Sequence, residues 1–406
     1  MRRSKKLSEE DWRAQIIDEL SLLVQKINVQ ELTKRASALK HNVHCEFRRD
    51  DSMMGCANYH AQLEFADRDI WLVRIPRRRF SDAPDDLIDY LVASEYATLK
   101  FLEPTKVPAP RAFDFGLVSD EEDLVGVSYL LIESFPGKPC DLSSMSEEQK
   151  DRIFAQVAEI LVEISKHPFA KAGSLISRDD HVEVSKMASN RFVQLGLSGP
   201  FGSALEYFQD ISEQYLDLIA DGQVHHRYPA EAFAFYTLAY NEAGVLASDD
   251  VIASDMVPEF FLKHVDDKGD HLLVDERGVI TGIIDWQFAR VTPANEAFGP
   301  YYITADLDSL YSNNTGITAE DKRLASKLRQ LSEHGMGYYM DNNELTRRFH
   351  HGLGEDCTKE EARKMLEGWR AALRVESTSS LDIWMSELCR KDSRWKKVHE
   401  LAVSST

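Results

Sequence analysis

Two aspartates, Asp266 and Asp285, stand at the two ends of a stretch that is typical of a tight β-hairpin. Residues 271–275 form one apolar run and residues 279–284 form a second, with Glu-Arg-Gly at 276–278 between them. Apolar runs joined by turn residues predict two antiparallel strands. Because a hairpin folds its ends back together, we expect both carboxylates to lie at one edge.

Lys268 and His271 lie between these two aspartates in the sequence. Carboxylate oxygens are the ligands that hard divalent cations prefer, and a lysine ammonium binds phosphate as a point charge. Together the four residues would form a site for a divalent metal and a phosphate group. Taken singly, an aspartate in a loop more often caps a turn or is solvated, and Lys268 could be only a solvated charge. The interpretation therefore depends on these residues meeting.

The segment 260–288 resembles the catalytic core of the aminoglycoside phosphotransferases and their choline kinase-like relatives, which share the protein-kinase-like fold. In kinases the catalytic loop reads H-x-D-x-K-x-x-N and is followed by a hairpin that ends in D-F-G. This chain has His264, Asp266 and Lys268 in register, and Asp285 begins the triplet Asp-Trp-Gln. The resemblance implies Asp266 as the base for an acceptor hydroxyl, Lys268 near the transferred phosphoryl group, and Asp285 as the ligand of Mg²⁺. His264 is expected to hold the loop and not to carry a proton.

One position departs from the pattern of this family. The metal-binding Asn is replaced by His271, which thereby becomes the second candidate metal ligand. Mg²⁺ prefers oxygen ligands, so an imidazole is a poor direct replacement. Either a water molecule or Asp270 completes the metal shell, or catalysis is impaired.

Composition limits the classes of protein that this chain can belong to. The chain has 406 residues, of which 43% are hydrophobic and 29% charged, and it contains no apolar run long enough to span a bilayer. Its start is briefly basic and then acidic, without the apolar core of a secretory signal. Five scattered cysteines without a C-x-x-C pair are typical of a reduced, cytoplasmic protein. A net charge of -20 argues against nucleic-acid binding and is compatible with a cationic substrate.

The order of predicted elements indicates an α+β, bilobal chain, and the resemblance implies that its fold is protein-kinase-like. Residues 1–40 are expected to form an N-terminal helical extension, with one amphipathic segment from residue 8 to about residue 39. Residues 41–136 would form a small β-rich N-lobe that binds nucleotide, including a hairpin around residues 66–69. Pro136-Gly137 breaks the chain. Residues 137–406 would form a larger, mainly helical C-lobe in which the catalytic hairpin is the exception.

The resemblance also assigns residues in the N-lobe. A basic residue on the third strand orients the nucleotide phosphates in this family, and a helix glutamate pairs with it. Arg74 and Glu95 occupy these positions, and an arginine fork binds phosphate as well as lysine does. Gly55 and Asn58 belong to a short G-x-x-N turn that would cover the phosphates. That turn is neither a Walker A motif nor a G-x-G-x-x-G loop, so it is weaker evidence.

A hinge between the lobes is expected at residues 131–135, where backbone groups would meet adenine. Glu133 and Phe135 are candidates by position, and a buried strand end is the alternative for both. Acids after the hairpin, including Asp306 and Asp308, are hypothesised to bind a polar or cationic acceptor, with a solvated helix face as the alternative.

Three functions compete. The first is an ATP- and Mg²⁺-dependent kinase that phosphorylates a hydroxyl of a small polar or cationic molecule. The second is a pseudokinase-like protein that binds nucleotide or a partner with weak or no catalysis, as His271 and the missing glycine after Trp286 suggest. The third, a protein kinase, is disfavoured by the lack of an A-P-E motif and a G-x-G-x-x-G loop. The joint presence of Asp266, Lys268 and Asp285 with Arg74 and Glu95 favours the first.

Overall fold

The computed structural model describes residues 9–49, 57–77, 84–179, 181–190, 193–248, 259–314, 316–331, 335–354 and 357–404. The chain divides into two compact units. The first comprises Met1–Pro104, Ala109–Pro136 and Ile176–Val182, and the second comprises Thr105–Pro108, Gly137–Leu175 and Glu183–Thr406. Among the described residues, no helix is both long and apolar enough to cross a membrane.

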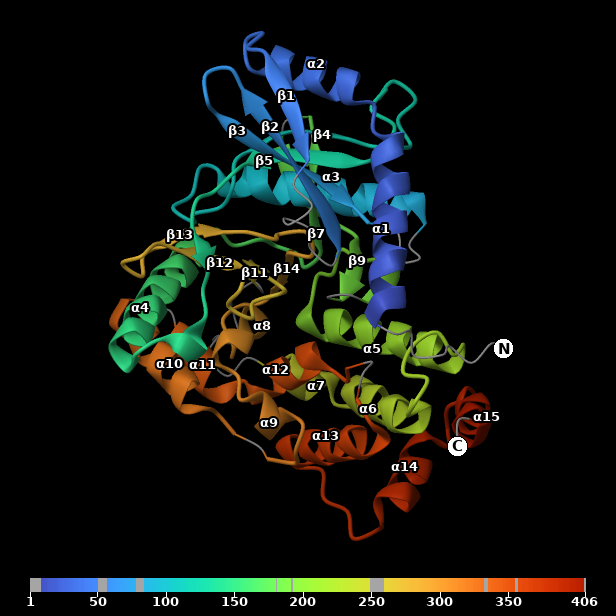
Figure 1. The fold of residues 1–406 in the computed structure, drawn as a ribbon. Coiled ribbons are helices and arrows are strands. Elements are labelled where there is room, and N and C mark those ends of the chain that lie inside the picture. Colours follow the sequence, from blue (N-terminus) through green and yellow to red (C-terminus); the bar gives the residue numbers. More distant parts are fainter. Residues whose placement is uncertain are drawn as a thin grey trace. The chain divides into compact units, whose positions relative to one another are not determined.

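A five-stranded sheet forms the centre of the first unit (Figure 1). Its strands are β1 (Cys45–Arg49), β2 (Asn58–Phe65), β3 (Ile70–Pro76), β4 (Ala112–Gly116) and β5 (Tyr129–Glu133). The spatial order is β1-β2-β3-β5-β4, and all neighbouring strands are antiparallel. The hairpin predicted around residues 66–69 is confirmed, and Arg68 in its turn has a φ of 72°.

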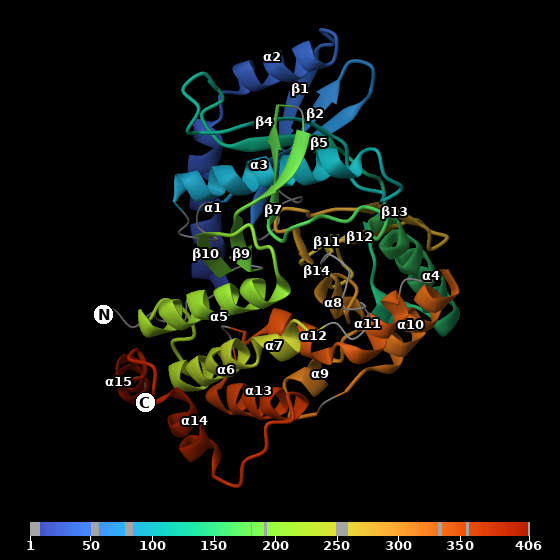
Figure 2. The ribbon, with the colours of Figure 1, turned by 180° about the vertical axis from the view of Figure 1, so that it is seen from behind.

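Different helices cover the two faces of this sheet. The helices of the first unit are α1 (Glu9–Lys26), α2 (Val29–Leu39) and α3 (Asp85–Leu102). Side chains alternate between faces along a strand, so Val73 and Ile75 of β3 point to one face and Arg74 to the other. The first face shares a hydrophobic core with α1 and α2, and Arg74 meets α3. Both views accordingly show α2 and α3 on opposite sides of the strands (Figures 1 and 2).

The N-terminal helical segment differs from the single helix that the sequence predicted. The helix ends at Lys26 and a new one begins at Val29, because Asn28 acts as an N-cap. The Asn28 side chain accepts a hydrogen bond from the Glu31 N–H (3.3 Å), and its own N–H donates to the Val125 carbonyl (2.8 Å). Asparagine is a weak helix former and a strong cap, so the break is local chemistry that hydrophobic periodicity hides.

The second unit is mainly helical, as the sequence predicted. Its helices are α4 (Glu147–Ile164), α5 (Ala204–Ala220), α6 (Pro229–Asn241), α7 (Ala243–Leu246), α8 (Ala294–Ala297), α9 (Leu307–Leu310), α10 (Ala319–Leu331), α11 (Met336–Asn342), α12 (Glu344–His351), α13 (Lys359–Ala372), α14 (Leu381–Cys389) and α15 (Trp395–Ser404). Helix α6 is buried on every side and contacts α5, α13, α14 and α15. A helix that is apolar all round is the centre of a helical core, and Figure 2 shows α6 between α5 and α13.

Short strands follow residue 136, and they are more numerous than the sequence predicted. They are β6 (Lys138–Pro139), β7 (Ser174–Arg178), β8 (His181–Ser185), β9 (Met187–Asn190), β10 (Val193–Ser198), β11 (Phe260–Lys263), β12 (Leu272–Val274), β13 (Ile280–Ile283) and β14 (Arg290–Pro293). The prediction that the catalytic hairpin is the exception is therefore wrong for residues 174–198, where β7 pairs with β8 and β9 with β10. These strands are short and β8 is not buried, so they lack the apolar run that marks a core strand.

Candidate active site

The predicted hairpin is confirmed, with shorter strands than expected. β12 and β13 pair antiparallel, and they begin and end inside the predicted runs 271–275 and 279–284. In the turn the Asp275 carboxylate accepts a hydrogen bond from the Arg277 N–H (2.8 Å), and Gly278 has a φ of 74°. A positive φ favours glycine, so the Glu-Arg-Gly sequence closes the turn as its chemistry predicts.

Helix α4 holds this turn from outside. Gln156 donates a hydrogen bond from Nε2 to the Gly278 carbonyl (2.9 Å), and its Oε1 accepts one from the Ile280 N–H (2.9 Å). The two strands also form a three-stranded sheet with β6, in the order β13-β12-β6. The hairpin is therefore fixed on both sides, and so is the direction in which the chain leaves β13 toward Asp285.

The loop between β11 and β12 is tied to the residue that precedes Asp285. The Ile284 N–H donates to the His271 carbonyl (2.9 Å), and the Ile284 carbonyl accepts a hydrogen bond from His264 Nε2 (2.9 Å). His264 and His271, at the two ends of the loop, are thus both joined to Ile284. These bonds tie the loop that carries Asp266 to the residue that precedes Asp285.

His264 lies at the centre of this arrangement. It is buried, and its ring packs against the rings of His271 (centroids 4.3 Å apart) and Trp286 (4.8 Å). Burial lowers the pKa of His264 below its usual value, while the Ile284 hydrogen bond and the nearby carboxylates of Asp285, Asp267 and Asp266 oppose that shift. A buried, bonded ring of this kind orders the loop, in agreement with the role expected for His264.

Asp266 and Lys268, the predicted catalytic pair, are brought together. Lys268 Nζ lies 3.2 Å from Asp266 Oδ2 and 3.8 Å from a carboxylate oxygen of Asp270. The Asp266 side chain is 13% exposed and that of Lys268 is 44% exposed. A largely buried carboxylate beside a solvent-accessible ammonium can accept a proton from an incoming hydroxyl while its charge is balanced.

Asp285 has an uncommon backbone conformation. Its φ is 69°, in the left-handed region that non-glycine residues rarely adopt. Its neighbour Trp286 is fully buried and donates from Nε1 to the Ile283 carbonyl (2.8 Å). Such strain costs roughly 1–3 kcal/mol and persists where the surroundings impose it, often at functional sites. Here the packing of Trp286 and the two hydrogen bonds of Ile284 impose the left-handed conformation on Asp285.

His271 is held in one orientation. Its Nδ1 accepts a hydrogen bond from the Gly269 N–H (3.2 Å), and its ring stacks on His264. Burial lowers the pKa of His271 well below its usual value, and the neighbouring basic side chains His264, Lys268 and Lys263 add to that shift. The neutral ring with Nδ1 as acceptor carries its proton on Nε2. In this tautomer neither nitrogen presents a lone pair to a metal.

The donors near the loop can nevertheless be tested against Mg²⁺. Among the described residues, no group of three or more His, Cys, Asp or Glu side chains forms a metal site. Mg²⁺ is commonly held by one or two carboxylates, substrate phosphates and water, and not by a cage of protein ligands. Asp285, fixed in place and a hard oxygen donor, fits that chemistry, and His271 in its present tautomer does not.

Two residues that sequence reasoning missed stabilise the loop between β11 and β12. Lys263 and Asp267 are buried and lie 3.2 Å apart (Nζ to Oδ2), and the Lys263 ammonium stands 3.8 Å from the centroid of the Tyr301 ring. Asp267 also accepts a hydrogen bond from the Tyr302 N–H (3.0 Å). The signal in the sequence is the lysine that ends the apolar run Phe-Phe-Leu, four residues before an aspartate. A charge in a buried strand requires a partner nearby.

A second missed contact reaches the loop from α12. His350 Nε2 donates to the carbonyl of Val265 (3.0 Å), the residue before Asp266. The other ring nitrogen faces Glu296 Oε1 at 3.8 Å, and Glu296 also pairs with the buried Arg290 (3.3 Å). This contact joins residues 85 positions apart in the chain, so no local sequence pattern reveals it.

The first unit brings together its own predicted pair. Arg74 Nε lies 3.3 Å from Glu95 Oε2, and both side chains are at most 6% exposed. A surface ion pair contributes little, whereas breaking a buried one leaves an uncompensated charge at a cost of about 3–5 kcal/mol. The Arg74–Glu95 pair is a buried ion pair, and it fixes Arg74 of β3 against α3.

The remaining predicted residues of the first unit have different settings. Asn58 is buried at the start of β2 and lies opposite Pro76. Glu133 accepts a hydrogen bond from the Arg111 N–H (3.2 Å), so its carboxylate closes the end of the sheet. Phe135 is half-buried after β5. Gly55 lies outside the described residues.

Comparison with known proteins decides the family. The model of the phosphotransferase enzyme family matches residues 57–302, which is more than half of the chain and includes the Arg74–Glu95 pair and the segment from Asp266 to Asp285. The chain belongs to the phosphotransferase enzyme family. This assignment confirms the resemblance stated from residues 260–288. Among curated proteins, no sequence matches the chain.

Solved structures add the fold of this phosphotransferase. A fructosamine-3-kinase, described as putative, from Thermobifida fusca YX-ER1 is similar with a TM-score of 0.50 and 15% identity, over 84% of this chain and 98% of that one. An aminoglycoside phosphotransferase, also described as putative, from Ralstonia eutropha JMP134 gives 0.48 and 12%, over 93% and 99%. Ethanolamine kinase from Plasmodium vivax gives 0.46 and 9%, over 89% and 82%. The first of these supports the predicted protein-kinase-like fold.

Asp306 and Asp308, the acids expected to bind the acceptor in this phosphotransferase, lie at the start of helix α9. Asp306 is the N-cap of α9, where its carboxylate accepts hydrogen bonds from the Ser309 N–H (3.1 Å) and hydroxyl (2.8 Å). These bonds lower the pKa of Asp306. Asp308 is exposed in the first turn of the same helix. The solvated, capping alternative explains both residues.

Proposed function

We propose that this chain is an ATP-dependent phosphotransferase that transfers a phosphoryl group to a hydroxyl of a small polar or cationic molecule. The observation that carries the proposal is the arrangement around His264, which holds Asp266, Lys268 and the strained Asp285 on one fixed loop and hairpin. A protein that only binds a partner has no need to keep these three residues together with the buried Arg74–Glu95 pair.

Each residue would have a definite task in the transfer. Asp266 would orient the acceptor hydroxyl and accept its proton, while Lys268, 3.2 Å from Asp266, would balance charge near the transferred group. Arg74, kept in place by Glu95, would bind the nucleotide phosphates. Mg²⁺ held by Asp285 would neutralise charge on the phosphate oxygens. Little covalent chemistry is required of the protein, because positioning and charge neutralisation supply most of the rate.

The experiment that tests the proposal is incubation with ATP and Mg²⁺ in the presence of a panel of hydroxylated metabolites and aminoglycosides. ADP formation that depends on one class of acceptor is the expected result. ATP that binds and raises the melting temperature without any consumption would favour the pseudokinase-like alternative. The bonded Nδ1 of His271 is the observation that keeps this alternative open.

Replacing His271 with asparagine tests whether the histidine limits Mg²⁺ binding, which bears on the choice between the kinase and the pseudokinase-like protein. Asn places an amide oxygen near the present Nδ1, so it keeps an acceptor for the Gly269 N–H and adds the hard donor that Mg²⁺ prefers. The Mg²⁺ concentration for half-maximal ATP stabilisation is expected to fall, by up to about tenfold for a gain of about 1.4 kcal/mol. Thermal shift at stepped Mg²⁺ concentrations measures it.

The matched control is His271→Leu, which removes the ring nitrogens and supplies no oxygen. We expect its Mg²⁺ requirement to equal that of the unmodified protein, although its melting temperature should be lower because the Gly269 N–H loses its acceptor. A weaker response to Mg²⁺ in both variants would show instead that the imidazole itself binds the metal.

A further inference from the structure

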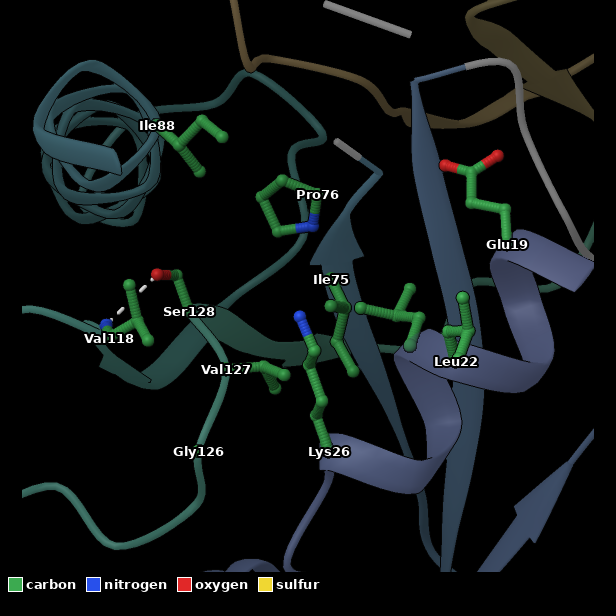
Figure 3. A pocket seen from close by; sticks show the side chains of 11 residues that line it. Glu19, Leu22, Lys26, Ile75, Pro76, Ile88, Val118, Gly126, Val127 and Ser128 are labelled. Atoms are coloured by element: carbon green, nitrogen blue, oxygen red, sulfur yellow. Dashed lines mark hydrogen bonds between the residues drawn. The ribbon is translucent and has the colours of Figure 1, made fainter. Parts of the chain in front are cut away.

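A pocket of about 220 Å³ lies in the first unit, between the last turns of α1 and the end of β3 (Figure 3). Its walls are mainly aliphatic, with Leu22 and Leu23 from α1, Ile75 from β3, Ile88 from α3 and Val127 from the segment before β5. The predicted catalytic residues Asp266, Lys268 and Asp285 do not line it. It is therefore separate from the candidate active site.

One face of α1 supplies a whole wall of this pocket. Glu19, Leu22, Leu23 and Lys26 follow the spacing i, i+3, i+4 and i+7, which places them on the same side of a helix. The residues Ile16 and Leu20 of α1 are buried in the core with the sheet. Leu23 also packs against that core, whereas Leu22 is exposed, so this wall of the pocket lies at the edge of the core.

The pocket is built by contacts that fix both ends of this wall. At one end Glu19 pairs with Arg77, at 2.7 Å, and both side chains are largely buried. At the other end the Asn28 N–H bonds to the Val125 carbonyl (2.8 Å), and Gly126 approaches α1 so closely that a Cβ there would lie 2.6 Å from the Lys26 carbonyl oxygen. Helix α1 is held at two points, and the space between them is not filled.

Two charged side chains line the pocket, Glu19 and Lys26. Glu19 is paired with Arg77. The Ser128 hydroxyl donates to Asp89 and accepts a hydrogen bond from the Val118 N–H (3.0 Å). Lys26 forms no ion pair with any residue in the described part of the chain. Figure 3 shows its side chain extending from the end of α1 over the pocket toward Ile75 and Val127.

The geometry points to a binding site for a small anionic amphiphile, a molecule with a short aliphatic body and a single carboxylate. The body would lie against Leu22, Ile75 and Ile88, and the carboxylate would pair with the Lys26 ammonium. Burial of the apolar body supplies the affinity, and the lysine ammonium selects a negatively charged ligand. A water molecule occupies about 30 Å³, so a pocket of this size holds a chain of several carbons and not a whole membrane lipid.

This position couples the pocket to the predicted nucleotide site, an argument that rests on the proposed function. Ile75 directly follows Arg74 in β3, and Ile88 lies two turns before Glu95 on the same face of α3. An occupant therefore contacts both elements that carry the buried ion pair. Any change that it makes in nucleotide affinity must be matched by an equal change in its own affinity when nucleotide binds.

Titration with sodium octanoate tests the site directly, without nucleotide, by calorimetry. The unmodified protein is expected to bind octanoate more tightly than octan-1-ol. Lys26→Met keeps an aliphatic side chain and removes the charge, so octanoate should bind about two- to fivefold more weakly while octan-1-ol is unaffected. Leu22→Ser should weaken the binding of both ligands, because it removes part of the aliphatic wall. Leu22 is 62% exposed, so its replacement leaves the core intact.

Two matched controls keep the test specific. Lys34→Met removes an exposed lysine of α2 that pairs with Glu31 (3.0 Å), and Ile17→Ser removes an apolar side chain of α1 that is 66% exposed and outside the pocket. Neither should change octanoate binding. Octanoate that binds Lys26→Met and Leu22→Ser as tightly as the unmodified protein would overturn the site. If octanoate binds as expected but ATP affinity stays the same, the site stands and the coupling is overturned.

Discussion

Replacing Asp266 with asparagine is expected to lower the rate of phosphoryl transfer by about 10²- to 10⁴-fold, the range that general-base catalysis contributes. Asparagine matches aspartate in shape but cannot take up the acceptor proton. The side chain contacts Lys268 and is not part of the apolar core, so folding and ATP binding should persist. Steady-state turnover and the dissociation constant for ATP, measured on the same preparation, separate the two effects.

Asp270→Asn is the matched control for this change. It removes a carboxylate of the same charge, 3.8 Å from the same lysine, but from a side chain that is 64% exposed. If a water molecule and not Asp270 completes the metal shell, we expect turnover within about twofold of the unmodified protein, because an exposed pair contributes little. Equal losses in Asp266→Asn and Asp270→Asn would mean that only local charge matters, and Asp266 would then not be the base.

Replacing Asp285 with asparagine is expected to reduce turnover by about 10²-fold or more, because a bound cation supplies several kcal/mol of charge stabilisation. Asparagine is the informative substitution here. It tolerates the left-handed backbone that Asp285 adopts, at a φ of 69°, so the fold is retained while the anionic ligand is lost. The stabilisation of the protein by ATP should lose its dependence on Mg²⁺, which thermal shift with and without the cation measures.

Asp179→Asn controls for the backbone effect. Asp179 is exposed, has a φ of 48° and lies in the turn between β7 and β8. The same substitution at this left-handed position should leave turnover and the Mg²⁺ response unchanged. A full Mg²⁺ response in Asp285→Asn would remove this carboxylate from the metal site.

The parts of the site that the sequence predicted are those encoded by local pattern. Two apolar runs joined by Glu-Arg-Gly specify the hairpin, because turn geometry and strand alternation are properties of neighbouring residues. The pairing of Arg74 with Glu95 was implied by the family resemblance, which assigned the two residues to a strand and the next helix. The break at Asn28 was missed, because periodic apolar residues on both sides of it conceal a capping residue.

The parts that the sequence did not predict depend on contacts between distant segments. His350 holds the Val265 carbonyl across 85 positions of the chain, and Gln156 holds the hairpin turn across 122 positions. Nothing in the sequence near either residue requires these partners. The tautomer of His271 is of the same kind, since it follows from a loop conformation that brings the Gly269 N–H to Nδ1.

Detection of the phosphorylated product by ³¹P NMR tests the central claim most directly. The protein is incubated with ATP, Mg²⁺ and pools of small hydroxylated molecules, and Asp266→Asn is run in parallel. A new phosphomonoester signal that grows in step with ADP, and that is absent with Asp266→Asn, is the predicted result. ATP binding with no phosphomonoester in any pool, or a phosphomonoester that forms equally with Asp266→Asn, would contradict the assignment of this chain as a kinase that uses Asp266.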